Sequence, residues 1–269
     1  MSTLKVKPLG KSGRVIAVTP ENAGWTYVGF ELYRLSPGES AEAATGGRET
    51  CLVFVTGKGR VSVDGDDFGV LGERMSPFDG KPWSVYLPQG SRWKVMAQTE
   101  LELAVCSAPG LGGGLPARVI APDTLGQETR GKGTNTRHVT NILPEGEPAD
   151  SLLVVEVITP GGHTSSYPPH KHDRDDLPNE SLLEETYYHR LDPPQGFAFQ
   201  RVYTDPDESG VREIDEAMAV EDGDVVLVPR GYHPCAACHG YDLYYLNVMA
   251  GPKRVWKFHN APEHEWLLK

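Results

Sequence analysis

The sequence has no histidine before position 138, and all nine of its histidines follow that point. Imidazole is the commonest transition-metal ligand and the usual acid–base group near neutral pH. The asymmetry therefore indicates two units, and it assigns any metal or acid–base chemistry to the second of them.

Other features are scarce, and each scarcity excludes a class of protein. No apolar run approaches the roughly 18–20 residues of a membrane helix, and Met1–Gly10 has no apolar signal core. Four cysteines are too few for a disulfide scaffold at this length, so we expect a cytoplasmic protein with reduced thiols. A net charge of −11 argues against a nucleic-acid partner, because neutralising phosphates requires clustered Lys and Arg.

Turn-forming residues, in contrast, are abundant, with 30 glycines and 22 prolines. They separate short runs that alternate apolar and polar residues, such as Arg60–Asp64 and Leu101–Val105, which is typical of strands. Only Glu208–Val220 and the C-terminal end have a weakly helical pattern. The breaker cluster Pro109–Pro116 marks a boundary. We therefore predict an all-β protein with one barrel at 1–115, followed by a connector and a second barrel at 116–269.

Three short motifs recur in the same order in the two halves, which predicts an internal duplication. The alignment pairs Glu49 with Glu185, and it places Arg92 where the second half has His233. We expect the N-terminal copy to lack metal ligands. The motif pairs are Ser36–Gly38 with Thr159–Gly161, Arg48–Thr50 with Glu184–Thr186, and Tyr86–Arg92 with Leu227–His233.

Candidate metal ligands lie in the second half. His170 and His172 would share one face of a strand, because side chains alternate with a period of two. Glu185 and His233 belong to two further strand-like segments. Three imidazoles and one carboxylate suit zinc, iron(II), manganese or nickel. Glu184 is a competing carboxylate, and the alignment with Glu49 favours Glu185.

The spacing of these ligands resembles the two motifs of the cupin superfamily. The first motif runs from Gly162 through the histidine pair to Glu185, and the second is Gly223-x5-Pro-x-Gly-x-His233. The gap between His172 and Glu185 is longer than in most cupins, so we expect an inserted loop beside the site.

Longer segments resemble the 5-deoxy-glucuronate isomerase family of myo-inositol catabolism. That resemblance implies a bicupin of two tandem jelly-roll-like barrels with one divalent metal per chain. It also implies interconversion of 5-deoxy-D-glucuronate and 2-deoxy-5-keto-D-gluconate. Distantly similar ketol-isomerases of pectin breakdown have the same set of ligands and usually use zinc. Zinc is therefore the first expectation here, with manganese, iron and nickel as alternatives. The segments are 165–173, 183–190, 200–204, 225–234 and 241–251.

Aldose–ketose isomerisation needs proton carriers. Tyr187 and His189 alternate with Glu185 and should face the same interior, so we predict that they are catalytic. Packing is the alternative role for Tyr187. Tyr245 and Asn247 share a face of the last strand; Tyr245 is a candidate substrate contact, and core packing is the alternative.

A sugar-acid substrate also needs a cation for its carboxylate. Arg201 is the first candidate, with a structural ion pair as the alternative, and Arg174 and Lys171 come next. The basic segment Arg130–Arg137 is compatible with reaching the pocket, contacting a neighbouring subunit or serving as a linker.

Two rival functions remain open. The same ligands would suit a cupin iron(II) dioxygenase, and a non-catalytic bicupin could bind a sugar acid without turnover. In each case we expect a small anionic ligand and no membrane partner. The sequence leaves the oligomeric state undetermined, with a homo-oligomer as one option.

Overall fold

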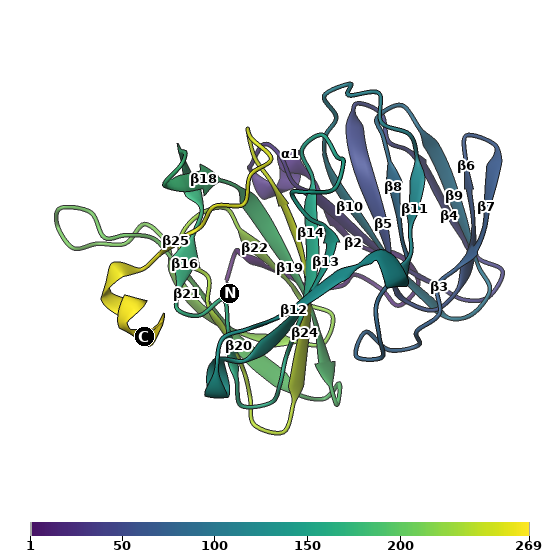
Figure 1. The fold of residues 1–269 in the computed structure, drawn as a ribbon. Helices are drawn as coiled ribbons and strands as arrows, with labels where there is room; N and C mark the ends of the chain where they lie inside the picture. The colour runs from purple at the N-terminus through teal and green to yellow at the C-terminus, as the bar shows by residue number, and fades with distance from the viewer. Residues whose placement is uncertain (1, 269) are drawn as a thin grey trace. The chain divides into compact units, whose positions relative to one another are not determined.

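The computed structural model describes residues 2–268, and strands dominate it (Figure 1). Helical structure within these residues is limited to α1 (Pro20–Ala23) and three short 3-10 turns, η1 (Pro122–Thr124), η2 (Gly133–Asn135) and η3 (Pro262–Leu268). None of the described helices is long and apolar enough to cross a membrane. The all-β prediction is confirmed.

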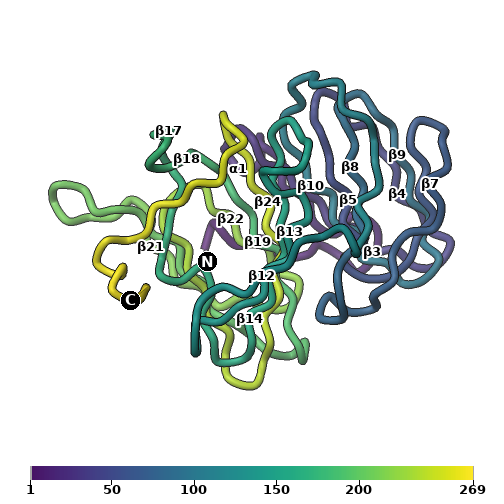
Figure 2. The backbone as a smooth tube through the Cα atoms, in the orientation of Figure 1, coloured from purple at the N-terminus to yellow at the C-terminus, as the bar shows by residue number. Residues whose placement is uncertain are grey.

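The chain folds as two compact units that interleave in sequence. Unit 1 comprises residues 2–7, 127–139 and 156–268, and unit 2 comprises residues 8–126 and 140–155. These borders differ from the expected division into 1–115 and 116–269, because the first strand belongs with the C-terminal barrel. Figure 2 shows the N-terminal trace running beside β22.

Unit 1 is built around two antiparallel sheets. The larger sheet has the order β1 (Lys5–Val6), β22 (Val225–Val228), β19 (Glu184–Asp192), β24 (Asp242–Ala250), β14 (Leu153–Thr159), β13 (Arg137–Leu143) and β12 (Gly126–Arg130). The smaller sheet has the order β15 (Thr164–Ser165), β23 (Cys235–Ala237), β20 (Phe197–Tyr203) and β21 (Asp215–Glu221).

The core of unit 1 is formed by the inward residues of these strands. On β19 and β24 these include Tyr187, Leu191 and Tyr245, and on β20 they include Ala198 and Val202. Alternate residues of β20 are exposed, as expected for a strand with one face toward a core. The barrel interior is therefore lined by alternate side chains, and these also supply the candidate site.

Two short strand pairs complete unit 1. β16 (His170–Lys171) pairs with β25 (His259–Asn260), so the C-terminal segment lies against the first predicted ligand. β17 (Asp173–Asp176) pairs with β18 (Glu180–Leu182). The expected insertion between His172 and Glu185 is therefore a hairpin.

Unit 2 also has two antiparallel sheets around an apolar core. One has the order β11 (Arg118–Ile120), β8 (Ser84–Leu87), β5 (Arg48–Thr56), β10 (Leu101–Pro109), β3 (Gly29–Leu35) and β2 (Gly13–Val18). The other has the order β4 (Ser40–Ala44), β9 (Arg92–Ala97), β6 (Gly59–Val63) and β7 (Asp66–Leu71).

The strand orders of the two units correspond over most of each sheet. In the larger sheets, the order β22-β19-β24-β14-β13 of unit 1 matches the order β8-β5-β10-β3-β2 of unit 2. In the smaller sheets, the order β15-β23-β20-β21 matches the order β4-β9-β6-β7. Strand β11 pairs with β8 in unit 2, as β1 pairs with β22 in unit 1. This shared topology supports the duplication predicted from the sequence.

The detailed alignment of the duplicated motifs, however, is off by one residue. Glu185 pairs with Val228, the residue before the Pro-x-Gly turn, and its counterpart before the equivalent turn in unit 2 pairs with Thr50. Glu49 instead points away from the barrel core, and its carboxylate accepts hydrogen bonds from the backbone of residues 150–152. Arg92 is exposed, and the next residue, Trp93, enters the core.

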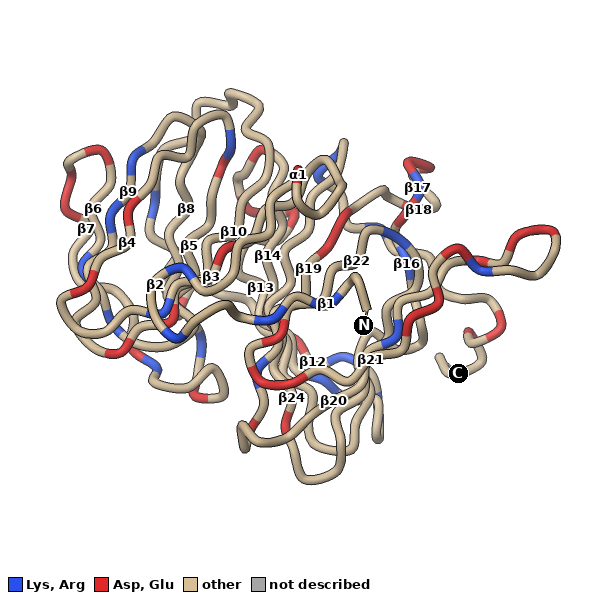
Figure 3. The backbone as a smooth tube through the Cα atoms, turned by 180° about the vertical axis from the view of Figure 1, so that it is seen from behind, with Lys and Arg blue, Asp and Glu red and all other residues tan. Residues whose placement is uncertain are grey.

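The prediction of a weakly helical segment at Glu208–Val220 is wrong. Its second half is strand β21, in which Met218 and Val220 are buried and alternate with exposed residues. Pairing along the whole of β20 overrides the weak helical preference of the segment. Acidic residues are spread along the backbone of both units (Figure 3), consistent with the net charge.

Candidate metal centre

Three of the four predicted metal ligands form one buried cluster. His172, Glu185 and His233 each offer an atom within 4.8 Å of the others. The Nε2 atom of His172 lies 3.1 Å from Glu185 Oε2, and the Nε2 atom of His233 lies 3.2 Å from the same oxygen. These donor types, converging on one point, form a nitrogen- and oxygen-rich candidate metal site.

Local structure places each of the three side chains. Glu185 lies on β19 and points to the interior face, while Glu184 does not join the cluster. His172 directly follows β16. His233 follows the turn after β22, where Gly231 has a φ of 89°, and a Cβ there would lie 2.4 Å from the Tyr203 carbonyl oxygen. Only glycine fits that turn, so it fixes the direction of the chain into His233.

Backbone carbonyls orient both imidazoles. The Nδ1 atom of His172 lies 3.0 Å from the Leu183 oxygen, and the Nδ1 atom of His233 lies 2.9 Å from the Gly231 oxygen. With Nδ1 of His233 donating its hydrogen, the Nε2 atom of this neutral ring carries the lone pair. Nε2 of His233 is buried and has no hydrogen-bond partner among the described residues. An orphaned acceptor aimed at a carboxylate and a second imidazole fits a bound cation.

Burial keeps His233 in the form that binds metal. Its side chain is fully buried, which lowers its pKa to about 4 even though Glu185 opposes that shift. Neutral imidazole is the coordinating form. The Glu185 carboxylate is held in turn by the side-chain amide of Asn247, which donates a hydrogen bond to Oε1 from the neighbouring strand β24. Asn247 therefore orients the acidic member of the cluster.

His170 lies next to this cluster but outside the group of three. Its ring centroid is 5.0 Å from that of His233 and 6.4 Å from that of His172. The other side of the ring packs on Phe258 at 4.6 Å. Burial and the two neighbouring histidines hold the pKa of His170 well below its usual range. The ring is therefore neutral and forms a wall between the cluster and the C-terminal segment.

The two predicted tyrosines share the interior of the barrel. Tyr187 lies with its ring centroid 5.7 Å from that of His233 and 4.9 Å from that of Tyr245. The Tyr187 hydroxyl is 2.9 Å from Ser166 Oγ, and the Tyr245 hydroxyl is 2.6 Å from Ser165 Oγ. Burial raises the pKa of both phenols. They are therefore hydrogen-bonding groups at neutral pH and belong to the core as well.

Ser166 has an unusual backbone conformation for its residue type. Its φ is 51°, in the left-handed region that residues other than glycine rarely adopt. Such conformations concentrate at functional sites. Here the Ser166 hydroxyl lies against the Tyr187 hydroxyl, a contact that no sequence motif indicates.

His189 lies behind Tyr187 and is completely buried. The two rings stack with centroids 5.8 Å apart. Its Nε2 atom donates to the side-chain oxygen of Gln200 at 2.9 Å, and Nδ1 has no partner within residues 2–268. Burial lowers the pKa of His189 to about 4. The ring is thus a neutral buried base that contacts the candidate site through Tyr187.

Protonation of His189 should make stability depend on pH. Between the folded pKa of about 4 and the ordinary value of 6.5, the unfolded chain binds more protons, so stability falls as the pH falls through this window. Full titration would remove roughly 3 kcal/mol at 1.36 kcal/mol per pKa unit. Urea unfolding at pH 7 and pH 4 should show a smaller pH difference for His189→Gln than for the parent protein. Equal pH differences in the two proteins would contradict this assignment.

The three predicted substrate-binding cations do not gather at the cluster. Arg201 is exposed on the outer face of β20, where it pairs with Asp215 through two hydrogen bonds of 2.8 and 2.9 Å. The alternation of β20 turns Gln200 inward and Arg201 outward. The structural ion pair considered for Arg201 is thus what the structure contains.

Lys171 and Arg174 both pair with Asp205. The Lys171 ammonium lies 2.6 Å from this carboxylate, and the Arg174 guanidinium lies 3.3 Å from it. Lys171 points away from the side shared by its neighbours in the histidine pair, since adjacent strand residues face opposite sides. Both cations line a separate polar cavity that contains none of the cluster residues.

A different set of cations borders the candidate site. A cavity of about 470 Å³ in unit 1 is lined by His170 and by Arg130, Lys132 and Arg137. These three belong to the basic segment for which the sequence left three roles open, and the structure brings them to a cavity. Phe258 and residues of η3 close its other side. A glycine-rich composition is also typical of a linker, so the sequence alone did not assign these cations to the cavity.

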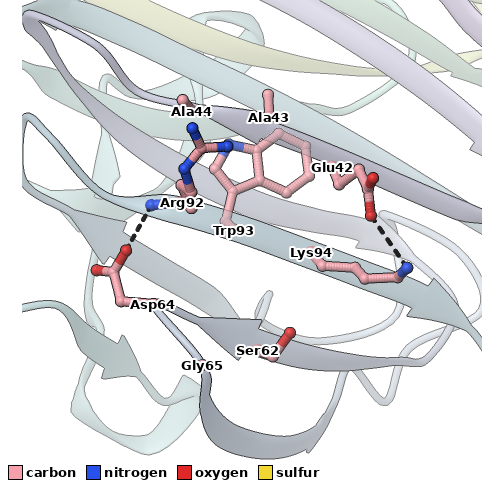
Figure 4. A pocket seen from close by; sticks show the side chains of 9 residues that line it. All are labelled: Glu42, Ala43, Ala44, Ser62, Asp64, Gly65, Arg92, Trp93 and Lys94. Atoms are coloured by element: carbon pink, nitrogen blue, oxygen red, sulfur yellow. Dashed lines mark hydrogen bonds and ion pairs between the residues drawn. The ribbon is translucent and has the colours of Figure 1, made fainter.

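Unit 2 has a cavity of about 530 Å³, shown in Figure 4. Its charged side chains are partly engaged: Lys94 lies 3.0 Å from Glu42, and Asp64 accepts a hydrogen bond from the Arg92 backbone. The nine residues that line it include neither histidine nor cysteine. The candidate catalytic chemistry therefore belongs to unit 1.

Relatives and solved structures agree with this architecture. A 5-deoxy-glucuronate isomerase of Geobacillus kaustophilus is 55% identical over 260 residues, which cover 96% of this chain and 92% of that protein. The one from Bacillus subtilis subsp. natto is 50% identical over 254 residues, covering 94% and 92%.

An IolB-like protein from Salmonella typhimurium superimposes with a TM-score of 0.95 at 52% identity, covering both chains completely. Oxalate decarboxylase of Bacillus subtilis has a TM-score of 0.62 at 14% identity, covering 97% of this chain and 80% of that one. The latter likeness shows the fold alone and supports the predicted cupin architecture. Residues 4–267 match the KduI/IolB family, and the chain belongs to that family.

Proposed function

We propose that this chain is a metal-dependent aldose–ketose isomerase that converts 5-deoxy-D-glucuronate to 2-deoxy-5-keto-D-gluconate. The observation that carries the proposal is the buried cluster of His172, Glu185 and His233, with an orphaned Nε2 atom, in a chain whose relatives are named 5-deoxy-glucuronate isomerase. Zinc is the first candidate metal, and manganese, iron and nickel suit the same ligands.

The three clustered side chains, with His170 beside them, would hold the metal. A bound divalent ion supplies Lewis acidity to the carbonyl and the neighbouring hydroxyl of the sugar, where negative charge develops during isomerisation. Asn247 keeps the Glu185 carboxylate aimed at the imidazoles. His170 packs against Phe258 on the side of the C-terminal segment.

The buried phenols define which proton steps the chain can perform. Because their pKa values are raised, Tyr187 and Tyr245 keep their protons at neutral pH and act as hydrogen-bond donors to substrate oxygens. Ser166 and Ser165 hold the two hydroxyls in place. His189 stacks on Tyr187 and hydrogen-bonds to Gln200, so it positions the phenol from behind.

Conversion of the substrate tests the proposal directly. Purified protein incubated with 5-deoxy-D-glucuronate should produce ketose signals in the NMR spectrum. Activity should disappear after chelation and return when one of the four candidate metals is added. Full activity of metal-free protein would contradict the Lewis-acid role.

The same experiment separates the two rivals. An iron(II) dioxygenase would consume oxygen when iron and substrate are supplied, and a binding protein would retain the substrate unchanged. Oxygen uptake without ketose formation would replace the isomerase assignment with the first rival. Substrate binding without any chemical change would favour the second.

A further inference from the structure

The cavity beside His170 is positively charged in an otherwise acidic chain. Arg130, Lys132 and Arg137 line it, and no aspartate or glutamate is among its lining residues. The chain as a whole carries a net charge of −11. Cationic lining next to the candidate metal centre creates a positive potential suited to an anionic ligand.

Arg137 differs from the other two cations in how its guanidinium is held. Its Nη1 atom donates to the Asn135 backbone oxygen at 3.1 Å, to the Asn135 side-chain oxygen at 3.2 Å and to the Tyr167 oxygen at 3.2 Å. The Nε and Nη2 atoms have no hydrogen-bond partner among the described residues. One edge of the group is therefore fixed, and the other edge is left for a ligand.

Arg137 also lacks a counter-charge. The groups that act on it electrostatically are Arg130, which repels it, and Tyr245, Cys235 and Tyr187, which carry no charge at neutral pH. Its side chain is partly buried, and burial lowers its pKa. A partly buried guanidinium without a carboxylate partner is costly to maintain. A bound anion would supply the missing charge.

Arg130 is already engaged. Its guanidinium lies 2.6 Å from Glu128, and its central carbon lies 5.0 Å from the centre of the Trp256 ring. Lys132 is exposed to solvent. Neither side chain matches Arg137, whose guanidinium is held on one edge and offers two N–H donors to a carboxylate on the other.

We propose that Arg137 is the residue that binds the substrate carboxylate, through Nε and Nη2, and thereby selects a sugar acid over a neutral sugar. The inference rests on the proposed function for the identity of the acid. His170 borders the same cavity and also contacts His233, so it connects the cavity of Arg137 with the metal cluster.

The test compares two substrates in two variants. Arg137→Gln removes the charge, and Arg137→Lys keeps the charge without the planar fork. Each is assayed with 5-deoxy-D-glucuronate and with the matching neutral sugar, in which a hydroxymethyl group replaces the carboxylate. Loss of a bidentate charged contact predicts a fall of about 100-fold in kcat/KM for the acid in Arg137→Gln. The neutral sugar should change little, and Arg137→Lys should recover only part of the loss.

The outcomes separate a binding role from a structural one. If Arg137 only anchors the backbone at Tyr167, both substrates should lose activity equally, and that result would overturn the proposal. Arg201→Gln provides the matched comparison, since its guanidinium pairs with Asp215 on the outer face. A selective loss for the acid in Arg201→Gln, with Arg137→Gln unaffected, would also overturn it.

Binding measurements keep the inference distinct from the proposed function. If the parent protein fails to convert either sugar, the isomerase proposal fails, and calorimetry with glucuronate and glucose still tests Arg137. Tighter binding of glucuronate in the parent protein, abolished by Arg137→Gln, would support the carboxylate site. Equal affinity for the two sugars in both proteins would overturn it.

Discussion

A His233→Ala variant is expected to purify without stoichiometric metal and to lose about a thousandfold in turnover. The estimate follows from the several kcal/mol that Lewis-acid stabilisation supplies, at 1.36 kcal/mol per tenfold change in rate. His233 presents an unpartnered Nε2 atom to Glu185, and no other described group hydrogen-bonds to that atom. Elemental analysis of the purified protein and the NMR assay measure the two effects.

His138→Ala is the matched control, because it removes an imidazole that is exposed on β13. It should retain both metal and turnover. Thermal unfolding of each variant establishes that the barrel remains folded. If His233→Ala kept a full metal complement and normal turnover, the cluster could not be the metal centre.

A Glu49→Ala variant should lose about 3–5 kcal/mol of unfolding free energy. The completely buried carboxylate accepts hydrogen bonds from the backbone N–H groups of Asp150, Ser151 and Leu152, and from the Tyr86 hydroxyl. Removing it leaves four donors without their acceptor, and each unsatisfied buried group costs roughly 1–3 kcal/mol before relaxation and water entry. Urea unfolding followed by tryptophan fluorescence measures the change.

Glu42→Ala is the comparison for a surface carboxylate of the same unit. Its side chain is 66% exposed and pairs with Lys94, so its loss should change stability by less than about 0.5 kcal/mol. Similar small losses in the two variants would show that the contacts of Glu49 with residues 150–152 contribute little. A large loss confined to Glu49→Ala would establish this carboxylate as a structural anchor of unit 2.

The candidate metal cluster was predictable because its information is local and periodic. Two signals carry it: a histidine pair with a spacing of two, and a histidine at a fixed distance after a Pro-x-Gly turn. Both can be recognised without knowing which strands are neighbours. In the structure Glu185, and not Glu184, joins the cluster. The alignment used to support that choice was wrong, because Thr50 and not Glu49 holds the equivalent register position.

The cations of the site were less predictable, because they depend on strand direction and long-range packing. One position along β20 decides whether Gln200 or Arg201 faces the interior, and periodicity alone does not fix that phase. Arg137 lies on a strand of the opposite sheet, in a segment that composition describes only as polar and glycine-rich. It reaches the cavity because η2 and the Tyr167 backbone position its guanidinium.

The family and the isomerase function were predictable from longer motifs, and the relatives confirm both. Those motifs cluster where the barrel interior and its turns constrain the residues most. The borders of the two units were not predictable from composition, because the breaker cluster Pro109–Pro116 lies within unit 2 and not at its end.

The position of β1 has a consequence for synthesis on the ribosome. This strand emerges before any of unit 2, yet its hydrogen-bonding partner β22 emerges more than two hundred residues later. At about 5–20 residues per second, the strand must wait for at least ten seconds in an unpaired state. Unit 2 can assemble in that interval, but the barrel that carries the candidate chemistry closes only after nearly the whole polypeptide has been made.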